Sequence, residues 1–233
     1  FKNPTYIGDP INTVRIFNEK EVDEIIILDI EASKNFQVPN FELLTSIAAE
    51  AFMPLGYGGG LSSIDQIKKV FELGFEKVII NSSTFSNYKL IEDAVKIFGS
   101  QSVVGCIDIK KSIFAKRYIY SHAGRKKQKI NIEKHINNLI KAGIGELIIQ
   151  CIDLDGTRNG YDYNFLNKIS KSIEIPTIGL GGAKDLNNML FTFNQTDLSA
   201  LAAGSIFVYF GPHNAVLINY PEREEILQLF RKI

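Results

Sequence analysis

The sequence of 233 residues predicts one α/β domain with the architecture of a (β/α)8 TIM barrel. Three observations support this fold class. Short apolar runs rich in β-branched residues alternate with longer amphipathic stretches, which is typical of βα units. The runs are apolar throughout, so each strand is expected to be covered on both faces, as in a parallel sheet. The two halves of the chain also repeat one spacing of aspartate, glycine and small polar residues, which indicates two half-barrels.

Seven strands are expected along the chain, and helical stretches separate them. The strands span residues 24–29, 53–57, 77–81, 102–108, 146–153, 175–180 and 198–204. Helical stretches such as SIDQIKKVFELG (63–74) begin near serine or asparagine and end at glycine, the residues that cap helices. The segment RYIYSHAGRK (117–126) is expected to form an extra strand that leads into a basic turn.

A closed barrel of this kind needs one strand more than these seven. The chain begins at Phe1 without a methionine, and we expect the eighth strand to lie before that residue. A doubly wound open sheet is the alternative arrangement of the same units. That fold would carry the pattern GxGxxG after its first strand, and the sequence lacks the pattern there. Because no linker or low-complexity segment divides the chain, residues 1–233 are expected to form a single domain.

The balance of charges excludes several classes of partner. Twenty-six basic and twenty-six acidic residues cancel, so the net charge gives no reason to expect nucleic acid or an anionic membrane as the partner. No apolar run approaches the roughly 18 to 20 residues that a membrane helix requires. We therefore expect a soluble, cytoplasmic protein whose anionic ligands are bound locally.

The cysteines and histidines do not form a recognisable site. Cys106 and Cys151 are too few for a disulfide framework and lie within apolar runs, so both are expected to be reduced. The three histidines share no spacing and have no cysteine cluster nearby, which argues against a metal site. They are expected on the surface or in loops, and they are His122, His135 and His213.

The internal repeat brings two similar sets of residues to successive strand ends. In the first half these are Asp29, glycines 58–60, Asn81 and Ser82. In the second half they are Asp153, glycines 181–182 and the turn at residues 203–205. In both halves about 30 residues separate the aspartate from the glycines, and about 21 more lead to the polar turn.

Each half is expected to hold a phosphate group. Glycines just past a strand let backbone N–H groups approach an anion, and the helix that follows adds the positive end of its dipole. Glycines of this kind also occur where only a tight turn is needed. Their recurrence at matching offsets, with Ser82 and Ser205 as added hydroxyl donors, favours the phosphate interpretation. A substrate with a phosphate at each end follows, and the basic turn GRKKQK (124–129) either contacts it or is solvated.

Three aspartates, Asp29, Asp108 and Asp153, are expected at the last positions of strands, the edge where barrel active sites form. One such aspartate alone would more often cap a helix or bond a loop. With three at one rim, at least one is expected to move protons during ring closure or isomerisation, and Asp108 is the candidate. Lys110 and Lys111 follow it, so its carboxylate is expected to stay ionised.

Seven motifs carry a resemblance that covers nearly the whole chain, from about Gly8 to about Phe210. They occur in the order LDIEAS, GYGGGLSS, KVIINSS, FGSQSVVGCIDIKK, CIDLDGTRNGYD, IGLGGAKD and SALAAGSIF. With these motifs the chain resembles the cyclase subunit of imidazole glycerol phosphate synthase, called HisF. The sister isomerase of histidine synthesis shares the half-barrel repeat, but the segments IDLDGT and FGSQ fit the cyclase better.

The resemblance implies a lyase of histidine biosynthesis that needs no cofactor and works with a glutaminase subunit similar to HisH. Such a cyclase uses ammonia from the glutaminase to cyclise a bisphosphorylated ribulosyl-formimino aminoimidazole carboxamide ribotide. Asp108 matches the catalytic aspartate on the family's fifth strand. The implied substrate-binding and phosphate-binding residues are Asp29, Gly60, Asn81, Ser82, Asp155, Gly156, Gly182, Gly204 and Ser205.

The opposite end of the barrel is expected to hold a gate for ammonia. Glu24, Lys77 and Glu146 stand at the first residues of alternate strands, where a charge pointing into the barrel is costly unless it is paired. They match three of the four charged residues that gate the family's ammonia tunnel. A glutaminase docked on this N-terminal face of the barrel would follow.

The chain also departs from the family pattern. The strand that carries the family's other catalytic aspartate is not in this chain, and the ending YFGPHNAVLINYP differs. At four positions near the substrate the family usually has small or hydroxyl side chains. This chain instead has Glu31, Ala123, Gln150 and Leu180 there. One alternative is therefore a paralogue that passes ammonia to a sugar amidotransferase of bacterial surface polysaccharide synthesis. A barrel that only supports its glutaminase is another.

Overall fold

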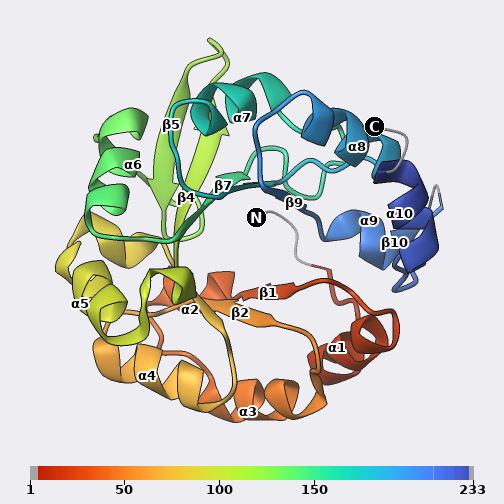
Figure 1. Cartoon of the computed structure of the whole chain (residues 1–233), viewed down its shortest axis with the longest axis horizontal. Coiled ribbons are helices and arrows are strands. Elements are labelled where there is room, and N and C mark those ends of the chain that lie inside the picture. Colours follow the sequence, from red (N-terminus) through yellow and green to blue (C-terminus); the bar gives the residue numbers. More distant parts are fainter. Residues whose placement is uncertain (1–4, 212, 231–233) are drawn as a thin grey trace.

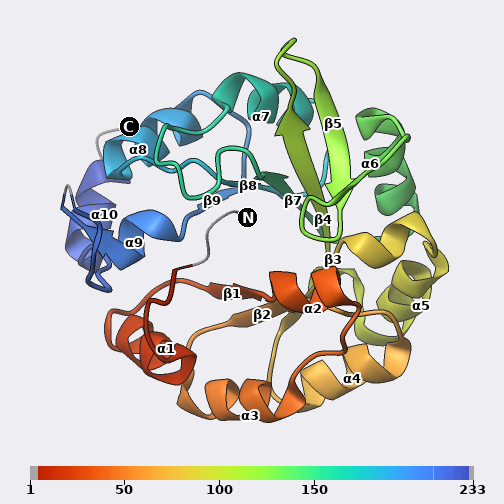
Figure 2. The same ribbon diagram turned by 180° about the vertical axis from the view of Figure 1, so that it is seen from behind.

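The computed structural model describes residues 5–211 and 213–230, and it has the curled parallel sheet of a (β/α)8 barrel. Helices surround the sheet in both end views (Figures 1 and 2). The seven parallel strands are β1 (Ile25–Leu28), β2 (Leu55–Gly58), β3 (Lys77–Ile80), β4 (Val103–Lys111), β7 (Glu146–Cys151), β8 (Thr177–Leu180) and β9 (Ala200–Ala202). The expected barrel architecture is confirmed, while the eighth strand expected before Phe1 lies outside the described residues.

The order of the strands rules out the doubly wound alternative. Hydrogen-bonded neighbours follow the chain as β1-β2-β3-β4-β7-β8-β9, and every pair along this path is parallel. A doubly wound sheet reverses its strand order at a switch point near the middle. The described strands show no such reversal.

In the described part of the chain, helices flank the parallel sheet, and a serine, asparagine or aspartate side chain caps seven of them. The helices are α1 (Pro10–Glu19), α2 (Ile30–Asn35), α3 (Phe41–Glu50), α4 (Ile64–Glu72), α5 (Lys89–Phe98), α6 (Ile132–Lys141), α7 (Tyr163–Ser170), α8 (Leu186–Asn194), α9 (Ser205–Val208) and α10 (Arg223–Phe230). Short 3-10 turns, η1 (Ser82–Phe85) and η2 (Ser100–Ser102), precede α5 and β4. The Ser63 side chain accepts the Gln66 N–H at the start of α4, as the cap pattern predicts. Among the described residues, no helix is long and apolar enough to cross a membrane.

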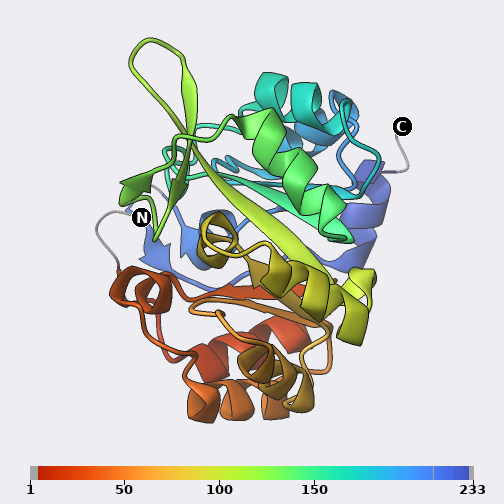
Figure 3. The ribbon, with the colours of Figure 1, turned by 90° about the vertical axis from the view of Figure 1, so that its left-hand side faces the viewer.

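The extra strand is confirmed, and it lengthens β4 beyond the predicted end. Antiparallel pairing joins β4 to β5 (Arg117–Ser121), and β5 pairs in turn with β6 (Lys126–Lys127). The hairpin projects above the barrel in side view (Figure 3). Because its register pairs Asp108 with Tyr120, β4 continues to Lys111. The prediction that Asp108 is the last residue of its strand is therefore wrong.

A second small hairpin follows the barrel strands. Its strands β10 (Tyr209–Phe210) and β11 (Ala215–Val216) pair antiparallel and fall within the ending that differs from the family pattern. The segment after them bonds back to the start of the chain. The Tyr220 hydroxyl donates to the Asp23 carboxylate at 3.2 Å, and Lys20 pairs with Glu222 at 2.9 Å.

Apolar residues cover both faces of the parallel sheet, as the unbroken apolar runs predict. The larger core lies between strands and helices, where Ile67, Ile91 and Leu147 are fully buried. A smaller cluster fills the barrel interior with Ile79, Val104, Cys106, Ile148 and Ile178. Side chains alternate along a strand, so Asp108 and Gln150 belong to the same inward-facing rows as Cys106 and Ile148.

Candidate active site

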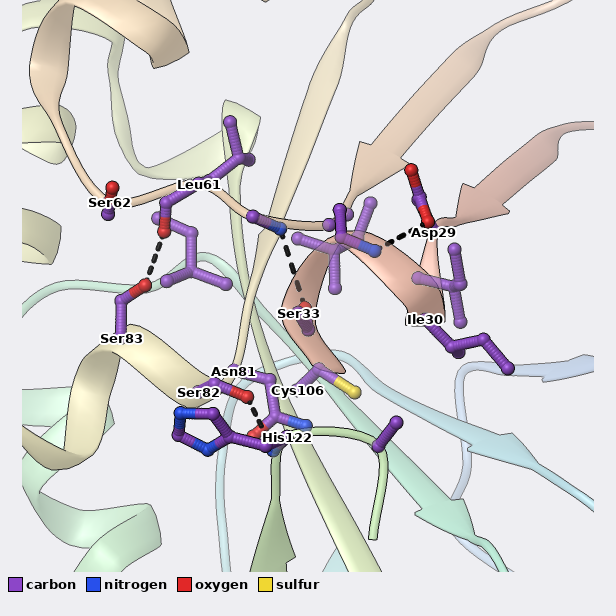
Figure 4. Close-up of a pocket in the computed structure, with 18 of the residues that line it drawn as sticks. Asp29, Ile30, Ser33, Leu61, Ser62, Asn81, Ser82, Ser83, Cys106 and His122 are labelled. Carbon is purple, nitrogen blue, oxygen red and sulfur yellow. Dashed lines mark hydrogen bonds between the residues drawn. The ribbon is translucent and has the colours of Figure 1, made fainter. Parts of the chain in front are cut away.

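A cavity of about 560 Å3 opens at the carboxyl ends of the first strands, and we call it the main cavity. Loops after β1, β2 and β3 and the end of the β4–β5 hairpin form its walls (Figure 4). Its lining includes six residues selected from the sequence, which are Asp29, Gly60, Asn81, Ser82, Asp108 and Gln150. The structure thus brings together residues that lie up to about 120 positions apart in the chain.

Asp108 lies buried at the base of this cavity, with 4% of its surface exposed. Burial raises the pKa of its carboxyl group to about 7; a hydrogen bond from the Asn81 side chain opposes the shift, and the Asp155 charge adds to it. The expectation that neighbouring lysines keep Asp108 ionised is wrong, since its pKa is raised and neither Lys110 nor Lys111 is among the groups that lower it. A carboxyl group that titrates near neutrality can both accept and return a proton.

The first glycine turn forms one wall of the main cavity. Gly60 has φ +66°, and a Cβ at this position would clash with the carbonyl oxygen of Gln37. Its N–H lies 3.4 Å from Ser33 Oγ. The Oδ1 of Asn81 is buried without a hydrogen-bond partner among the described residues, so it can accept a bond from a bound ligand.

Two serines that follow Asn81 differ in what they can offer a ligand. The Ser83 hydroxyl donates to the carbonyl of Leu61, so its proton is engaged within the protein. The Ser82 Oγ instead accepts the backbone N–H of His122 at 2.9 Å. The Ser82 proton therefore remains available for an anion in the cavity, as Figure 4 shows for both contacts.

The second half of the repeat forms a separate and much smaller hollow of about 10 Å3, which we call the second hollow. Gly182 has φ +100° and its carbonyl accepts the N–H of Gly160 at 2.7 Å, which holds the loop after β7 against the loop after β8. The residues predicted here all line it, and they are Asp155, Gly156, Gly182, Gly204 and Ser205. Arg158 also lines the second hollow and is a cation that the sequence pattern did not single out.

The three aspartates expected at one rim have different surroundings. Asp29 follows β1, lines the main cavity and caps α2, because its Oδ1 accepts the Ala32 N–H at 2.9 Å. Asp153 is exposed and its Oδ2 lies 3.4 Å from the Lys111 N–H, so it belongs to a turn. Asp108 alone among the three is buried. The sequence repeat could not separate these roles, because it reports spacing and not burial.

The four residues that depart from the family pattern lie in different places. Ala123 and Gln150 line the main cavity, and Leu180 lines the second hollow. Glu31 lines neither, since its carboxylate is exposed and is bonded to Lys34 at 2.5 Å and Asn35 at 3.1 Å. The expectation that Glu31 alters the mouth is therefore wrong. Gln150 is buried and pairs in register with Asp108, so it is the departure nearest the candidate chemistry.

The histidines fit the sequence expectation only in part. His213 is exposed in a turn. His135 is fully buried in α6, with Nδ1 2.6 Å from the Tyr88 hydroxyl and its ring stacked on Phe85, so the surface assignment is wrong. His122 is in a loop, but that loop lines the main cavity together with Lys126 of the basic turn. The basic turn was the sequence signal for Lys126, whereas no sequence signal selected His122.

The cysteines offer no redox or metal chemistry among the described residues. Cys106 and Cys151 are both buried and free. Burial raises the pKa of both, so neither is a reactive thiolate at neutral pH. Across residues 5–211 and 213–230, no group of three His, Cys, Asp or Glu side chains is arranged to hold a metal ion.

Three charged residues meet at the other end of the barrel interior. Lys77, the first residue of β3, lies 3.0 Å from Glu24 Oε2 and 3.0 Å from Glu146 Oε1. Partial burial lowers the pKa of Lys77, but hydrogen bonds to Glu146 and Glu24 outweigh it and raise that pKa. Glu24, Lys77 and Glu146 stand in the inward rows below Ile26, Ile79 and Ile148, and we call them the charged ring.

Comparison with known proteins identifies the family. The family model described as histidine biosynthesis protein matches residues 1–214. A protein of Pseudomonas aeruginosa provisionally named imidazole glycerol phosphate synthase subunit hisF2 is 45% identical over 222 residues, covering 95% of this chain and 88% of that protein. A HisF protein of Leptospira interrogans, also provisionally named, is 42% identical over 231 residues, covering 99% and 91%.

A third relative carries the HisF name without a provisional label. The imidazole glycerol phosphate synthase subunit HisF of Streptococcus mutans is 34% identical over 209 residues, covering 90% of this chain and 83% of that protein. Both kinds of relative therefore align with almost the whole barrel. The chain belongs to the family of histidine biosynthesis proteins and, within it, to the HisF-type cyclase subunits.

Proposed function

We propose that this chain uses ammonia from a partner glutaminase to cyclise a bisphosphorylated ribulosyl-formimino aminoimidazole carboxamide ribotide. The observation that carries the proposal is the buried Asp108, which lies at the base of the main cavity, at the same end of the barrel as the second hollow. Two hollows rich in glycine and hydroxyl groups suit a substrate with a phosphate at each end. The HisF-type relatives support the same reaction.

Asp108 is proposed to transfer protons during this reaction. Its pKa of about 7 leaves protonated and ionised forms both populated at neutral pH, which is what a group needs to accept a proton and give it back. The bond from the Asn81 amide fixes the carboxyl group in the barrel wall. Asn81 Oδ1, buried without a partner among the described residues, is proposed to accept a hydroxyl or amine hydrogen of the substrate.

The charged ring is proposed to admit ammonia from a glutaminase docked on that face. Between it and Asp108 the interior rows hold Ile79, Val104, Cys106 and Ile148, which offer no strong acceptor to a neutral NH3 molecule. Ammonium would be held back by the same lining, because an isolated charge is costly in an apolar environment. Neutral ammonia therefore suits this route better than its protonated form.

Turnover with ammonia tests the proposal directly. The purified protein, extended by any native residues that precede Phe1, is supplied with ammonium salt and the ribulosyl-formimino intermediate, and loss of the intermediate is followed. Asp108→Asn is expected to lower turnover by at least about 100-fold, the usual contribution of a general acid or base. Unchanged turnover in that variant would contradict the assignment of Asp108.

A second function is favoured by one observation, which is that Gln150 and Leu180 occupy positions facing the substrate. Gln150 places a buried amide beside Asp108, Leu180 lines the second hollow, and that hollow has a volume of only about 10 Å3. Lys77 nevertheless pairs with both glutamates of the charged ring. A barrel that passes ammonia from its glutaminase to a separate sugar amidotransferase would keep the ring while losing contacts to the cyclase substrate.

The two functions give opposite results in one experiment. A stable glutaminase complex with no turnover of the ribulosyl-formimino intermediate would favour the channel function. Restoring the hydroxyl side chains with Gln150→Thr and Leu180→Ser would then be expected to raise affinity for the intermediate. Turnover by the unmodified protein at a rate that depends on Asp108 would exclude the channel function as its sole role.

A further inference from the structure

A hydrogen-bonded chain of three side chains determines which nitrogen of His122 carries the proton. The Ser121 hydroxyl is fully buried; it accepts the Gln128 amide N–H at 2.6 Å and lies 2.9 Å from His122 Nδ1. A serine hydroxyl has one proton to donate. Because this hydroxyl is buried and His122 Nδ1 is the only acceptor bonded to it among the described residues, we direct its proton to Nδ1. A neutral His122 ring then carries its own hydrogen on Nε2.

The ring of His122 is held in the wall of the main cavity. Its backbone N–H donates to Ser82 Oγ, and its ring centre lies 4.9 Å from that of Phe36 across the mouth. His122 and Ala123 both have left-handed backbone angles, with φ of 53° and 54°. Two consecutive residues other than glycine in this region cost on the order of 1 kcal/mol each, so the contacts of the turn must maintain the conformation.

The ring is a neutral donor in this setting. Burial lowers the pKa of His122, and the nearby Lys126 charge lowers it further, so imidazole and not imidazolium prevails at neutral pH. A neutral ring with Nδ1 engaged presents a single N–H, directed from one fixed position. Lys126 lines the same cavity and supplies the positive charge that the ring does not.

We propose that His122 Nε2–H is a specific donor to the phosphate group held at Ser82, fixed in this role by Ser121 and Gln128. The proposal rests on the proposed function for the identity of the phosphorylated substrate. Ser82 contributes its free hydroxyl proton, His122 its ring N–H, and Lys126 its charge. These three groups come from η1, the β5–β6 turn and the first residue of β6, so the phosphate would join the hairpin to the barrel wall.

Nitrogen NMR of the histidine side chains tests the tautomer. With inorganic phosphate as the probe, the His122 ring is expected to show a protonated Nε2 and a bare Nδ1 both before and after addition. The Nε2–H resonance is expected to move as phosphate is added, while His213, exposed and outside the cavity, serves as the internal control. A proton on Nδ1, or an Nε2–H resonance that phosphate leaves unmoved, would overturn the proposal.

Binding measurements on variants test the donor itself. His122→Ala is expected to weaken phosphate binding about tenfold or more, the loss typical of one hydrogen bond to a charged group. His122→Gln, whose amide can reach a similar position, is expected to recover part of that loss, and His213→Ala to bind as the parent does. Thermal unfolding of each variant shows whether it is folded, and equal affinity in a folded His122→Ala would refute the role.

The NMR and phosphate-binding experiments do not require turnover, so the role of His122 can fail or hold independently of the cyclase reaction. Phosphate binding that depends on His122 in a protein without cyclase turnover would support the donor and reject the cyclase. Turnover that depends on Asp108, together with phosphate binding indifferent to His122, would support the cyclase and reject the donor. Gln128→Ala adds a third arm: loss of its bond to Ser121 is expected to mix the tautomers and weaken phosphate binding less than His122→Ala.

Discussion

At the scale of single residues, function depends on which inward-facing positions are polar. Along β4 the inward row passes from Val104 and Cys106 to Asp108, and along β7 from Ile148 to Gln150. The apolar members exclude water from beneath the polar ones. Asp108 therefore meets a low dielectric on one side and the main cavity on the other, which accounts for a carboxyl pKa near neutrality.

This burial makes the stability of the protein depend on Asp108 and pH. Between about pH 4, where the unfolded carboxyl group ionises, and about pH 7, the folded chain keeps a proton that the unfolded chain has lost. The free energy of unfolding consequently falls as pH rises through this window. Asp108→Asn removes this term, so the variant is expected to gain on the order of 4 kcal/mol relative to the parent between pH 4 and pH 8.

Urea denaturation of parent and variant at both pH values measures the gain. Only the difference between the two proteins is compared, because other groups titrate equally in both. A difference that stays constant with pH would show that the Asp108 pKa is not raised. A variant that is more stable at pH 8 yet inactive would separate a role in chemistry from a role in folding.

Gly60 of the main cavity and Gly204 of the second hollow give a matched pair of substitutions. At Gly60 a methyl group would meet the Gln37 carbonyl oxygen, and the left-handed φ of +66° adds strain, so Gly60→Ala is expected to cost about 1–3 kcal/mol. At Gly204 φ is −121° and a Cβ would meet open space. Gly204→Ala is expected to leave stability within about 0.5–1 kcal/mol of the parent. Thermal denaturation distinguishes them, and equal losses would contradict the geometry.

At the scale of elements, the β4–β5 hairpin builds one side of the main cavity, and an ion pair joins its β5 strand to the start of α7. Arg117 of β5 bonds to Asp162 at 3.0 Å through Nε and 2.5 Å through Nη2, and its guanidinium lies 4.6 Å from the ring centre of Phe165. Asp162 also caps α7. Both charged side chains are largely buried, so each depends on the other.

Removing the arginine is expected to loosen the hairpin. Arg117→Met leaves Asp162 without its partner and should cost about 1–3 kcal/mol in unfolding free energy. Hydrogen exchange should rise at the β5 amides, including that of the fully buried Ile119. Lys116→Met, at an exposed neighbour, is the control and should change stability by less than about 0.5 kcal/mol. Equal exchange in the two variants would show that Arg117 does not hold the hairpin.

Sequence reasoning found the elements because their signals are local. All seven strands were predicted with small errors at their ends, since an unbroken apolar run marks a strand even where it is only half-buried, as in β1, or partly exposed, as in β9. The end of β4 was misplaced because strand pairing with β5 is a tertiary contact. His135 was misassigned for a similar reason: only packing against Phe85 and Tyr88 shows that this histidine of α6 faces inward.

At the scale of the whole molecule, the internal repeat predicted those site residues that both halves of the chain share. Offsets common to both halves selected residues that line the main cavity and the second hollow. The repeat could not show that the two hollows differ greatly in size, or that His122 and Arg158 line them. Those features arise from the hairpin and from the loop after β7, which the halves do not share.

The charged ring and the main cavity lie at opposite ends of one barrel interior, so coupling between them is a property of the whole molecule. Lys77 joins Glu24 and Glu146, and without it two carboxylates would face each other in a partly buried site. Lys77→Met is therefore expected to lower the free energy of unfolding by about 1–3 kcal/mol. If the ring admits ammonia, the same change should alter how efficiently glutamine nitrogen reaches the cavity.

The ratio of turnover with glutamine plus glutaminase to turnover with ammonium salt measures that efficiency. We expect Lys77→Met to lower this ratio several-fold, because an unpaired ring would open to solvent and let ammonia escape or become protonated before it reaches Asp108. Lys68→Met, which breaks an exposed pair with Glu72 on α4, should leave both stability and the ratio unchanged. A ratio equal to that of the parent in a folded Lys77→Met protein would mean that ammonia enters the main cavity by another route.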